Sequence, residues 1–168
     1  MLLSCLYEST THNNVGIFIK LPKNLAIKFP KLKEDSSDPH ITILYLGDQK
    51  ISNKDKILAA ALEVVNKTEQ FSIKLDGLDY FDKNKDGQTV AYVKINSDSL
   101  RKLHTKLSVA MKQHGVKWTD TYGKYVPHVT LAYLDHGQEY DGKVPSGSFN
   151  CDSVEMWGFN KQLTLKFV

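Results

Sequence analysis

Two histidine–threonine pairs are the residues of this 168-residue chain whose types and spacing point most directly to chemistry. His40 precedes Thr42 in the octapeptide PHITILYL, and His128 precedes Thr130 in PHVTLAYL. An imidazole has an ordinary pKa near ~6.5, so it can act as a base or an acid at neutral pH. A threonine hydroxyl can donate a hydrogen bond to a phosphate oxygen as charge builds there. The four residues therefore suit metal-independent cleavage of a phosphodiester.

Both octapeptides are β-branched and apolar, which predicts that each is a strand. Alternate residues of a strand share a face, so each histidine faces the same way as its threonine. The same parity places Tyr45 and Tyr133 on the opposite, packing face. If a pseudo-twofold axis relates the two copies, both pairs line one cleft. One histidine would then deprotonate water or a ribose hydroxyl while the other protonates the leaving oxygen.

Two other interpretations of these motifs compete with catalysis: the histidines could be packed in the core, or they could bind a metal. A single His-x-Thr is more typical of a packed core histidine, whereas two matching octapeptides favour an internal duplication with a shared site. Zinc prefers His, Cys, Asp or Glu ligands, and each histidine here has a threonine beside it, so no metal or cofactor is expected. The segment Asp82–Gly87 resembles half of a calcium loop, but the twelfth position is Val93 instead of Glu, which favours a hairpin turn.

The elements that must position the two pairs repeat along the chain. Each half runs from a strand through a helical segment and a loop into its Pro-His-x-Thr strand, and further strands follow. The predicted strands are 15–21, 39–47, 71–81, 89–95, 127–134, 151–159 and 162–168. The predicted helices are a short segment at 24–29, one that begins at Ser52 as N-cap, and one at 99–114 that ends at Gly115.

Composition and charge exclude several classes of function. The net charge is only +3, and Arg101 is the single arginine among 22 basic residues, which argues against a surface that reads duplex DNA. No apolar run reaches the length of a membrane helix, and the N-terminus does not resemble a signal peptide, so a cytoplasmic location is expected. The chain is also expected to be a monomer. Cys5 and Cys151 are too few and too far apart to suggest a metal site or a disulfide framework.

Aromatic and basic residues near the second motif are candidates for substrate binding, because bases stack on aromatic rings at the rim of a cleft. His104 and His114 lack a counterpart in the other half and are predicted to be surface residues, and the lysine-rich face of the second helix is predicted to be solvated. The candidate substrate-binding residues are Trp118, Tyr122, Lys124, Tyr125 and Trp157.

The paired motifs resemble those of the 2H phosphoesterase superfamily, whose signature is two His-x-Thr/Ser motifs on duplicated lobes. The resemblance covers nearly the whole chain and implies one bilobal α+β domain over residues 1–168. It further implies two pseudo-twofold-related antiparallel sheets with flanking helices and a central cleft. By the same resemblance, His40, Thr42, His128 and Thr130 carry catalysis.

The resemblance implies a phosphodiesterase that acts on a small nucleotide, a cyclic oligonucleotide or an RNA end. Members of the superfamily include RNA 2′,3′-cyclic phosphodiesterases, viral enzymes that destroy 2′-5′ oligoadenylate, and phage counter-defence enzymes that destroy cyclic oligonucleotide signals. The alternative is a module that binds a nucleotide or an RNA end without turning it over. The sequence leaves open which substrate is used and which histidine is the acid.

Overall fold

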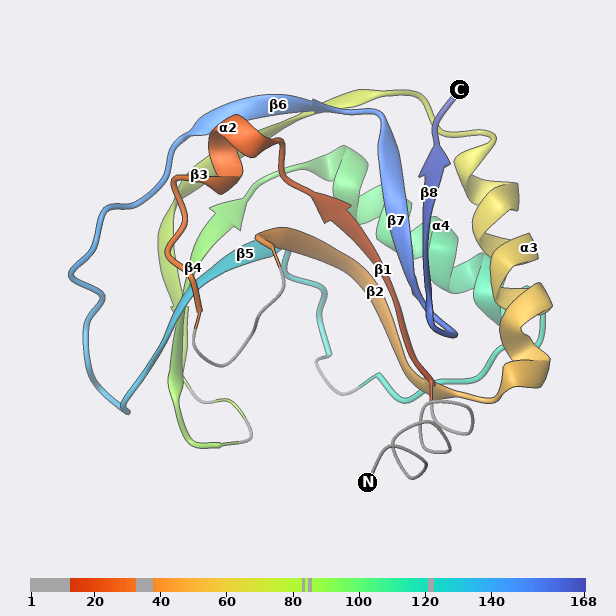
Figure 1. Cartoon of the computed structure of the whole chain (residues 1–168), viewed down its shortest axis with the longest axis horizontal. Coiled ribbons are helices and arrows are strands. Elements are labelled where there is room, and N and C mark those ends of the chain that lie inside the picture. Colours follow the sequence, from red (N-terminus) through yellow and green to blue (C-terminus); the bar gives the residue numbers. More distant parts are fainter. Residues whose placement is uncertain (1–12, 33–37, 83, 85, 121–122) are drawn as a thin grey trace.

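The strands form two four-stranded antiparallel sheets, which confirms the predicted α+β architecture (Figure 1). The computed structural model describes residues 13–32, 38–82, 84, 86–120 and 123–168. The first sheet has the order β2-β1-β7-β8 and the second the order β5-β4-β3-β6. The strands are β1 (Asn13–Lys20), β2 (His40–Gln49), β3 (Phe71–Phe81), β4 (Thr89–Ile95), β5 (His128–Leu134), β6 (Gly147–Cys151), β7 (Ser153–Gly158) and β8 (Lys161–Lys166).

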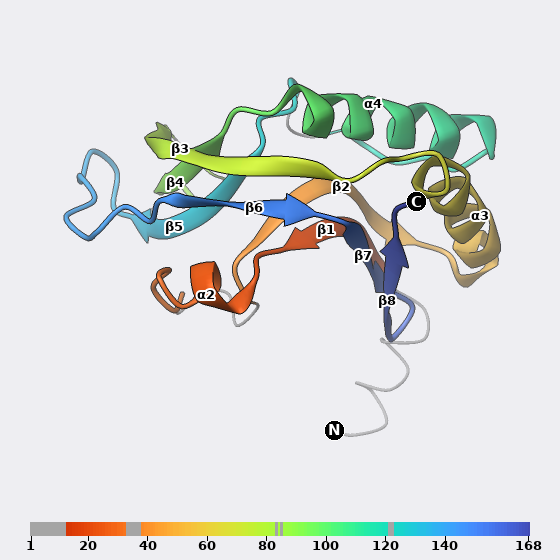
Figure 2. The same cartoon turned by 90° about the horizontal axis from the view of Figure 1, so that it is seen from above.

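The helices are α2 (Lys23–Ala26), the 3-10 turn η1 (Ile51–Asn53), α3 (Lys54–Val65) and α4 (Asp98–Gln113). Helices α3 and α4 pack against each other, and α4 also contacts β2. Figure 2 shows α4 along one side of the molecule and α2 on the opposite side. None of the helices in the described ranges combines the length and hydropathy that a bilayer crossing requires.

Helix α4 follows the pattern predicted from its apolar stripe. The hydroxyl of Ser97 accepts a hydrogen bond from the backbone N–H of Leu100, which caps the first turn. At the other end, Gly115 has a φ of +78°, and the N–H of Val116 bonds back to the carbonyl of Met111. This left-handed glycine closes the helix, as predicted.

A continuous hydrophobic core joins both sheets to α3 and α4. The residues that alternate with the His–Thr pairs lie within this core, so the predicted packing face of each motif is confirmed. Burying these side chains on both central strands anchors the backbone that carries the two pairs. The fully buried members from the two motifs are Ile41, Ile43, Val129 and Leu131, each at most 1% exposed.

Two sequence-based boundaries differ from the structure. No strand was predicted between 134 and 151, but β6 begins there at Gly147. As the edge strand of its sheet, β6 is largely exposed and lacks the apolar alternation that identifies a strand. Ser52 is not the cap of α3, because residues 51–53 form η1. The side-chain amide of Asn53, the residue before α3, donates to Gln49 Oε1 at 3.1 Å.

Strands β2 and β5, which meet in the middle of the molecule, hold equivalent positions in the two halves. Each is the edge strand of its own sheet, and the two strands contact each other. In each half the first residue of the strand is the histidine, paired with a lysine of the neighbouring strand: His40 with Lys20, and His128 with Lys94. Figure 1 shows that β2 and β5 start near the centre and run in opposite directions.

Candidate active site

Each histidine ring makes a hydrogen bond with the backbone carbonyl of the residue two positions earlier in its own half. Nδ1 of His40 lies 2.8 Å from the carbonyl oxygen of Asp38, and Nδ1 of His128 lies 2.8 Å from that of Val126. A carbonyl oxygen only accepts, so Nδ1 must carry the proton and donate. In this tautomer the unprotonated nitrogen of each neutral ring is Nε2, so Nε2 is the atom that would exchange a proton with a substrate.

Aromatic rings surround each imidazole in a matching arrangement. Phe18 meets the ring of His40 edge-on, with centroids 5.1 Å apart and planes at 86°; Phe81 meets His128 at 5.0 Å and 83°. A second ring flanks each histidine, Trp157 for His40 at 5.5 Å and Tyr92 for His128 at 5.3 Å. Together with the Nδ1 hydrogen bonds, these contacts restrict the rotation of both imidazoles.

One cavity of about 2210 Å³ receives both His–Thr pairs. His40 and Thr42 from the first sheet and His128 and Thr130 from the second all line it. The charge of His40 also affects the titration of His128, as expected of two groups that face a common space. The structure therefore brings the two pairs together, as the internal repeat predicted.

Burial lowers the pKa of His128 below its ordinary value of 6.5. The positive charge of His40 lowers this pKa further, whereas the hydrogen bond to the carbonyl of Val126 acts in the opposite direction. The neutral form of His128 is therefore favoured at neutral pH.

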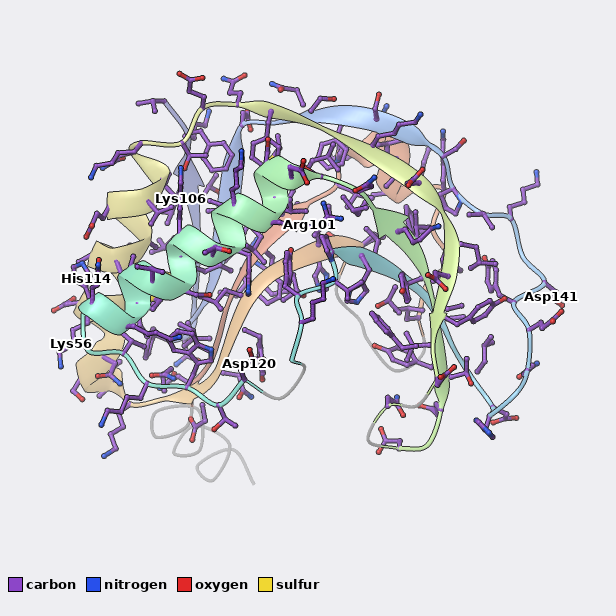
Figure 3. The ribbon with its side chains drawn as sticks, turned by 180° about the vertical axis from the view of Figure 1, so that it is seen from behind. Lys56, Arg101, Lys106, His114, Asp120 and Asp141 are labelled. Atoms are coloured by element: carbon purple, nitrogen blue, oxygen red, sulfur yellow. The ribbon has the colours of Figure 1, made fainter. Side chains whose placement is uncertain are left out.

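Basic residues outnumber acidic ones among the described residues that line the cavity. Lys112 is the one residue of the lysine-rich face of α4 that lines the cavity within the described part of the chain; Lys102 and Lys106 do not line it. Figure 3 shows Arg101 and Lys106 along α4, where Arg101 is paired at 3.0 Å with Asp98. The charged lining residues are Lys20, Lys23, Lys31, Lys112, Lys117 and Lys124, with Asp38 and Asp120.

The predicted substrate-binding residues divide into three groups. Trp118, Lys124 and Tyr125 line the cavity. Trp157 is not among the described lining residues. Its ring instead packs against Phe18 and His40. When the side-chain amide of Gln162 is oriented to satisfy its hydrogen bonds, its oxygen accepts from the indole N–H of Trp157 at 3.2 Å. Tyr122 lies outside the described residues.

His104 was expected at the surface, and this expectation is wrong. Its ring is half-buried and stacks on Tyr125, with centroids 4.1 Å apart and planes at 9°. Nδ1 of His104 lies 2.7 Å from the carbonyl oxygen of Ile43, and the hydroxyl of Tyr125 donates to the carbonyl of Thr42 at 2.9 Å. The stacked pair thus holds the first motif's backbone, a long-range role that α4's sequence pattern does not reveal. His114 is only partly exposed and pairs with Glu63 at 2.8 Å.

Tyr45 and Tyr133 were expected on the packing face, and this expectation is also wrong. Both side chains line the cavity, and Tyr45 is 45% exposed. Strand parity predicts the packing face only if each strand is regular. Each strand instead has a register shift directly after its His-x-Thr motif.

No group of three or more His, Cys, Asp or Glu side chains within the described residues could hold a metal ion. The segment after β3 forms a turn, as predicted. Asn84 Oδ1 accepts hydrogen bonds from the backbone N–H groups of Asp86 and Gln88, each at 2.9 Å. This bonding is typical of an Asx turn within a hairpin.

Comparisons with known proteins agree with the two-sheet arrangement. The model of the 2′-5′ RNA ligase superfamily matches residues 23–161. A crystal structure of TT0787 from Thermus thermophilus is similar, with a TM-score of 0.68, 14% identity, and coverage of 92% of this chain and 98% of that one. No curated protein matches the chain.

Two further solved structures share the fold. Escherichia coli LigT complexed with 3′-AMP has a TM-score of 0.66 and 17% identity, with coverage of 92% of this chain and 96% of that one. The MHV ns2 PDE domain has a TM-score of 0.54 and 18% identity, with coverage of 82% and 97%. At these identities the likeness establishes the shared fold.

Proposed function

Since the chain belongs to the 2′-5′ RNA ligase superfamily of 2H phosphoesterases, we propose that it is a metal-independent phosphodiesterase of small cyclic or 2′-5′-linked nucleotides. The observation that carries this proposal is that two equivalent His–Thr pairs face one cavity. The names of the structural neighbours support the substrate class, because LigT has been crystallised with 3′-AMP, ATP and NADP+. The lysines around the cavity suit an anionic ligand of this kind.

In the proposed reaction, His128 acts as the general base and His40 as the general acid. Nε2 of His128 removes a proton from water (or from a neighbouring ribose hydroxyl), and the oxygen attacks phosphorus. The bond from phosphorus to the leaving oxygen breaks, and His40, which must carry protons on both ring nitrogens to act as the acid, donates its Nε2 proton to that oxygen. Water attack on a cyclic phosphate gives a phosphomonoester, and the catalytic protons balance. The low pKa of His128 favours the neutral ring that a base requires.

The threonines stabilise the phosphoryl oxygens in this mechanism. Thr42 and Thr130 lie two residues after the histidines on the same strands and line the same cavity. Their hydroxyls would donate hydrogen bonds to the non-bridging oxygens, where negative charge accumulates in the transition state. Fixed donors on strands cost little reorganisation during the reaction.

The alternative is a module that binds a nucleotide or an RNA end without catalysis. One experiment separates the two functions. The protein is incubated in EDTA with adenosine 2′,3′-cyclic phosphate, cyclic dinucleotides, cyclic trinucleotides and 2′-5′ oligoadenylate, and the products are identified by chromatography. We expect turnover of at least one compound. Binding of a compound without any product would favour the module, and turnover that requires added metal would overturn the mechanism.

The catalytic roles of the histidines have their own test. We expect His40→Ala and His128→Ala each to lower kcat by about 10²-fold or more, the scale of general acid–base catalysis, with the melting temperature largely retained. His114→Ala is the matched control, since His114 pairs with Glu63 and does not line the cavity in the described structure. A near-normal rate in either variant would remove that histidine from the mechanism.

A further inference from the structure

The two central strands carry the same irregularity at the same place. In the first sheet, Phe18 pairs with Thr42 but Ile17 pairs with Leu44, so β2 has one extra residue at Ile43. In the second sheet, Tyr92 pairs with Thr130 but Ala91 pairs with Ala132, so β5 has its extra residue at Leu131. An extra residue of this kind is a β-bulge, which reverses the faces of the residues beyond it.

The reversal brings one tyrosine of each strand into the cavity. On β2 both Ile43 and Leu44 are buried, so Tyr45 returns to the face of His40 and Thr42. On β5 the same change brings Tyr133 into the cavity. Thr42 and Tyr45 pair with residues two apart on β1, and Thr130 and Tyr133 with residues two apart on β4, so at a rise of about 3.3 Å per residue each tyrosine lies roughly 7 Å along the sheet from its threonine.

The strands that carry the two tyrosines run in opposite directions from the histidines at their starts. β2 and β5 start near the centre with their histidines and run in opposite directions, so their later residues diverge (Figure 1). A phosphodiester whose phosphorus lies between the two imidazoles extends one nucleoside towards each strand. Such a substrate would direct one base towards the strand of Tyr45 and the other towards the strand of Tyr133.

From this arrangement we infer that Tyr45 and Tyr133 are stacking platforms for two bases, one on each side of the scissile phosphate. The inference rests on the proposed function and narrows its substrates to those with a nucleoside on both sides of the phosphate, such as a dinucleotide or a longer linear or cyclic oligonucleotide. Stacking on an aromatic ring tolerates any base, so the platforms select for the number of nucleosides and not for sequence.

The size and charge of the cavity agree with a substrate larger than one nucleotide. Its volume of about 2210 Å³ exceeds the ~300–1,000 Å³ of an ordinary small-molecule site. Lysines from separate segments line it, including Lys23 and Lys31 before the first motif and Lys117 and Lys124 before the second. Additional phosphates of an oligonucleotide would find cations on both sides of the centre.

Kinetics with two substrates test the platforms. We expect Tyr45→Ala and Tyr133→Ala each to raise KM for 2′-5′-linked ApA by about 5- to 100-fold, the range of one lost base stack, while Tyr45→Phe and Tyr133→Phe retain the KM of the native protein. Adenosine 2′,3′-cyclic phosphate has one base, so only one of the two alanine variants should raise its KM. Tyr140→Ala is the matched control, because Tyr140 is half-buried and bonds the carbonyl of Lys143 away from the described lining residues.

A binding measurement separates this inference from the proposed function. The inactive double variant His40→Ala/His128→Ala is titrated with ApA by calorimetry, with and without each tyrosine substitution. If this variant binds ApA, the tyrosine substitutions weaken that binding, and the native protein cleaves none of the compounds, the platforms are retained and the phosphodiesterase is rejected. Cleavage of ApA with an unchanged KM in both alanine variants would reject the platforms and retain the phosphodiesterase. Failure of the inactive variant to bind ApA would overturn the platforms.

Discussion

At the scale of single residues, the proposed mechanism depends on two imidazoles with the same tautomer and matching aromatic neighbours. Both rings donate from Nδ1 to a carbonyl two residues earlier, so both present Nε2 for proton transfer. Burial lowers the pKa of His128, which favours the neutral ring that a general base requires. This direction is the reason for proposing His128 as the base, a role that the repeat alone left open.

The pH dependence of kcat/KM is the first test at this scale. A general base must be unprotonated, so activity should rise with pH through the pKa of His128, which lies below 6.5. We expect the midpoint of the acidic limb below pH 6.5, and a titration of the His128 ring by NMR should give the same midpoint. His114→Gln should leave the profile unchanged. An acidic limb of kcat/KM with its midpoint above pH 6.5, or with a midpoint that matches the titration of a different histidine, would contradict the proposal that His128 is the base.

The threonine hydroxyls provide the second test. Thr42→Val and Thr130→Val keep the side-chain shape but remove the donor, so each should lower kcat by about 10²- to 10³-fold, the effect of losing one oxyanion donor. KM should change little, and serine at either position should retain most of the rate. Thr105→Val is the control, because Thr105 also lines the cavity but donates its hydroxyl to the carbonyl of Arg101. Equal rates in the valine variants and the control would contradict the role.

At the scale of elements, β2 is held from the other half of the molecule. Tyr125 belongs to the loop before β5, yet its hydroxyl bonds the carbonyl of Thr42 on β2. His104 of α4 stacks on Tyr125 and bonds the next carbonyl, that of Ile43. These two contacts hold the backbone at the β2 bulge, so they also determine how Thr42 and Tyr45 are placed.

Removing the Tyr125 hydroxyl tests this support. Tyr125→Phe should lower the free energy of unfolding by about 1 kcal/mol, the usual net value of one hydrogen bond. It should also lower kcat by about tenfold with little change in KM, because Thr42 is misplaced and not removed. Tyr140→Phe is matched to it, since that hydroxyl also bonds a backbone carbonyl, that of Lys143. If both variants lose stability but retain the native kcat, Tyr125 is structural only.

At the scale of the whole molecule, the cavity concentrates positive charge on a chain whose net charge is only +3. Among the described residues, six lysines and two aspartates line it, from segments far apart in the sequence. Such a field raises the local concentration of an anionic substrate, and salt screens it. The distribution of charge thus supports a polyanionic substrate more strongly than the net charge does.

The dependence of KM on ionic strength tests this distribution. For 2′-5′ oligoadenylate we expect KM to rise between about 50 and 200 mM salt, values that bracket ordinary screening, and to rise more steeply as the oligonucleotide lengthens. The double variant Lys117→Gln/Lys124→Gln should flatten this dependence. The control is Lys56→Gln/Lys106→Gln, which removes two lysines outside the described lining residues (Figure 3). Identical slopes in the two double variants would show that the cavity lysines are not involved.

The sequence by itself determined the duplication, most strands, both long helices and the four polar residues of the two motifs. These features depend on local patterns: strand alternation, an apolar helical stripe and a repeated octapeptide. A second repeat, Phe18-Ile19-Lys20-Leu21 and Tyr92-Val93-Lys94-Ile95, is also visible in the sequence and would have identified two of the rings beside the histidines.

Only the tertiary structure decided the rest of the site. The bulges that turn Tyr45 and Tyr133 into the cavity arise from pairing with β1 and β4, and a strand's own sequence does not specify where its partner's register slips. The contacts of His104 and Tyr125 with β2 span 61 and 83 residues, so no local pattern indicates them. Alternation along one strand predicts which residues share a face, but the neighbouring strand determines where that alternation is interrupted.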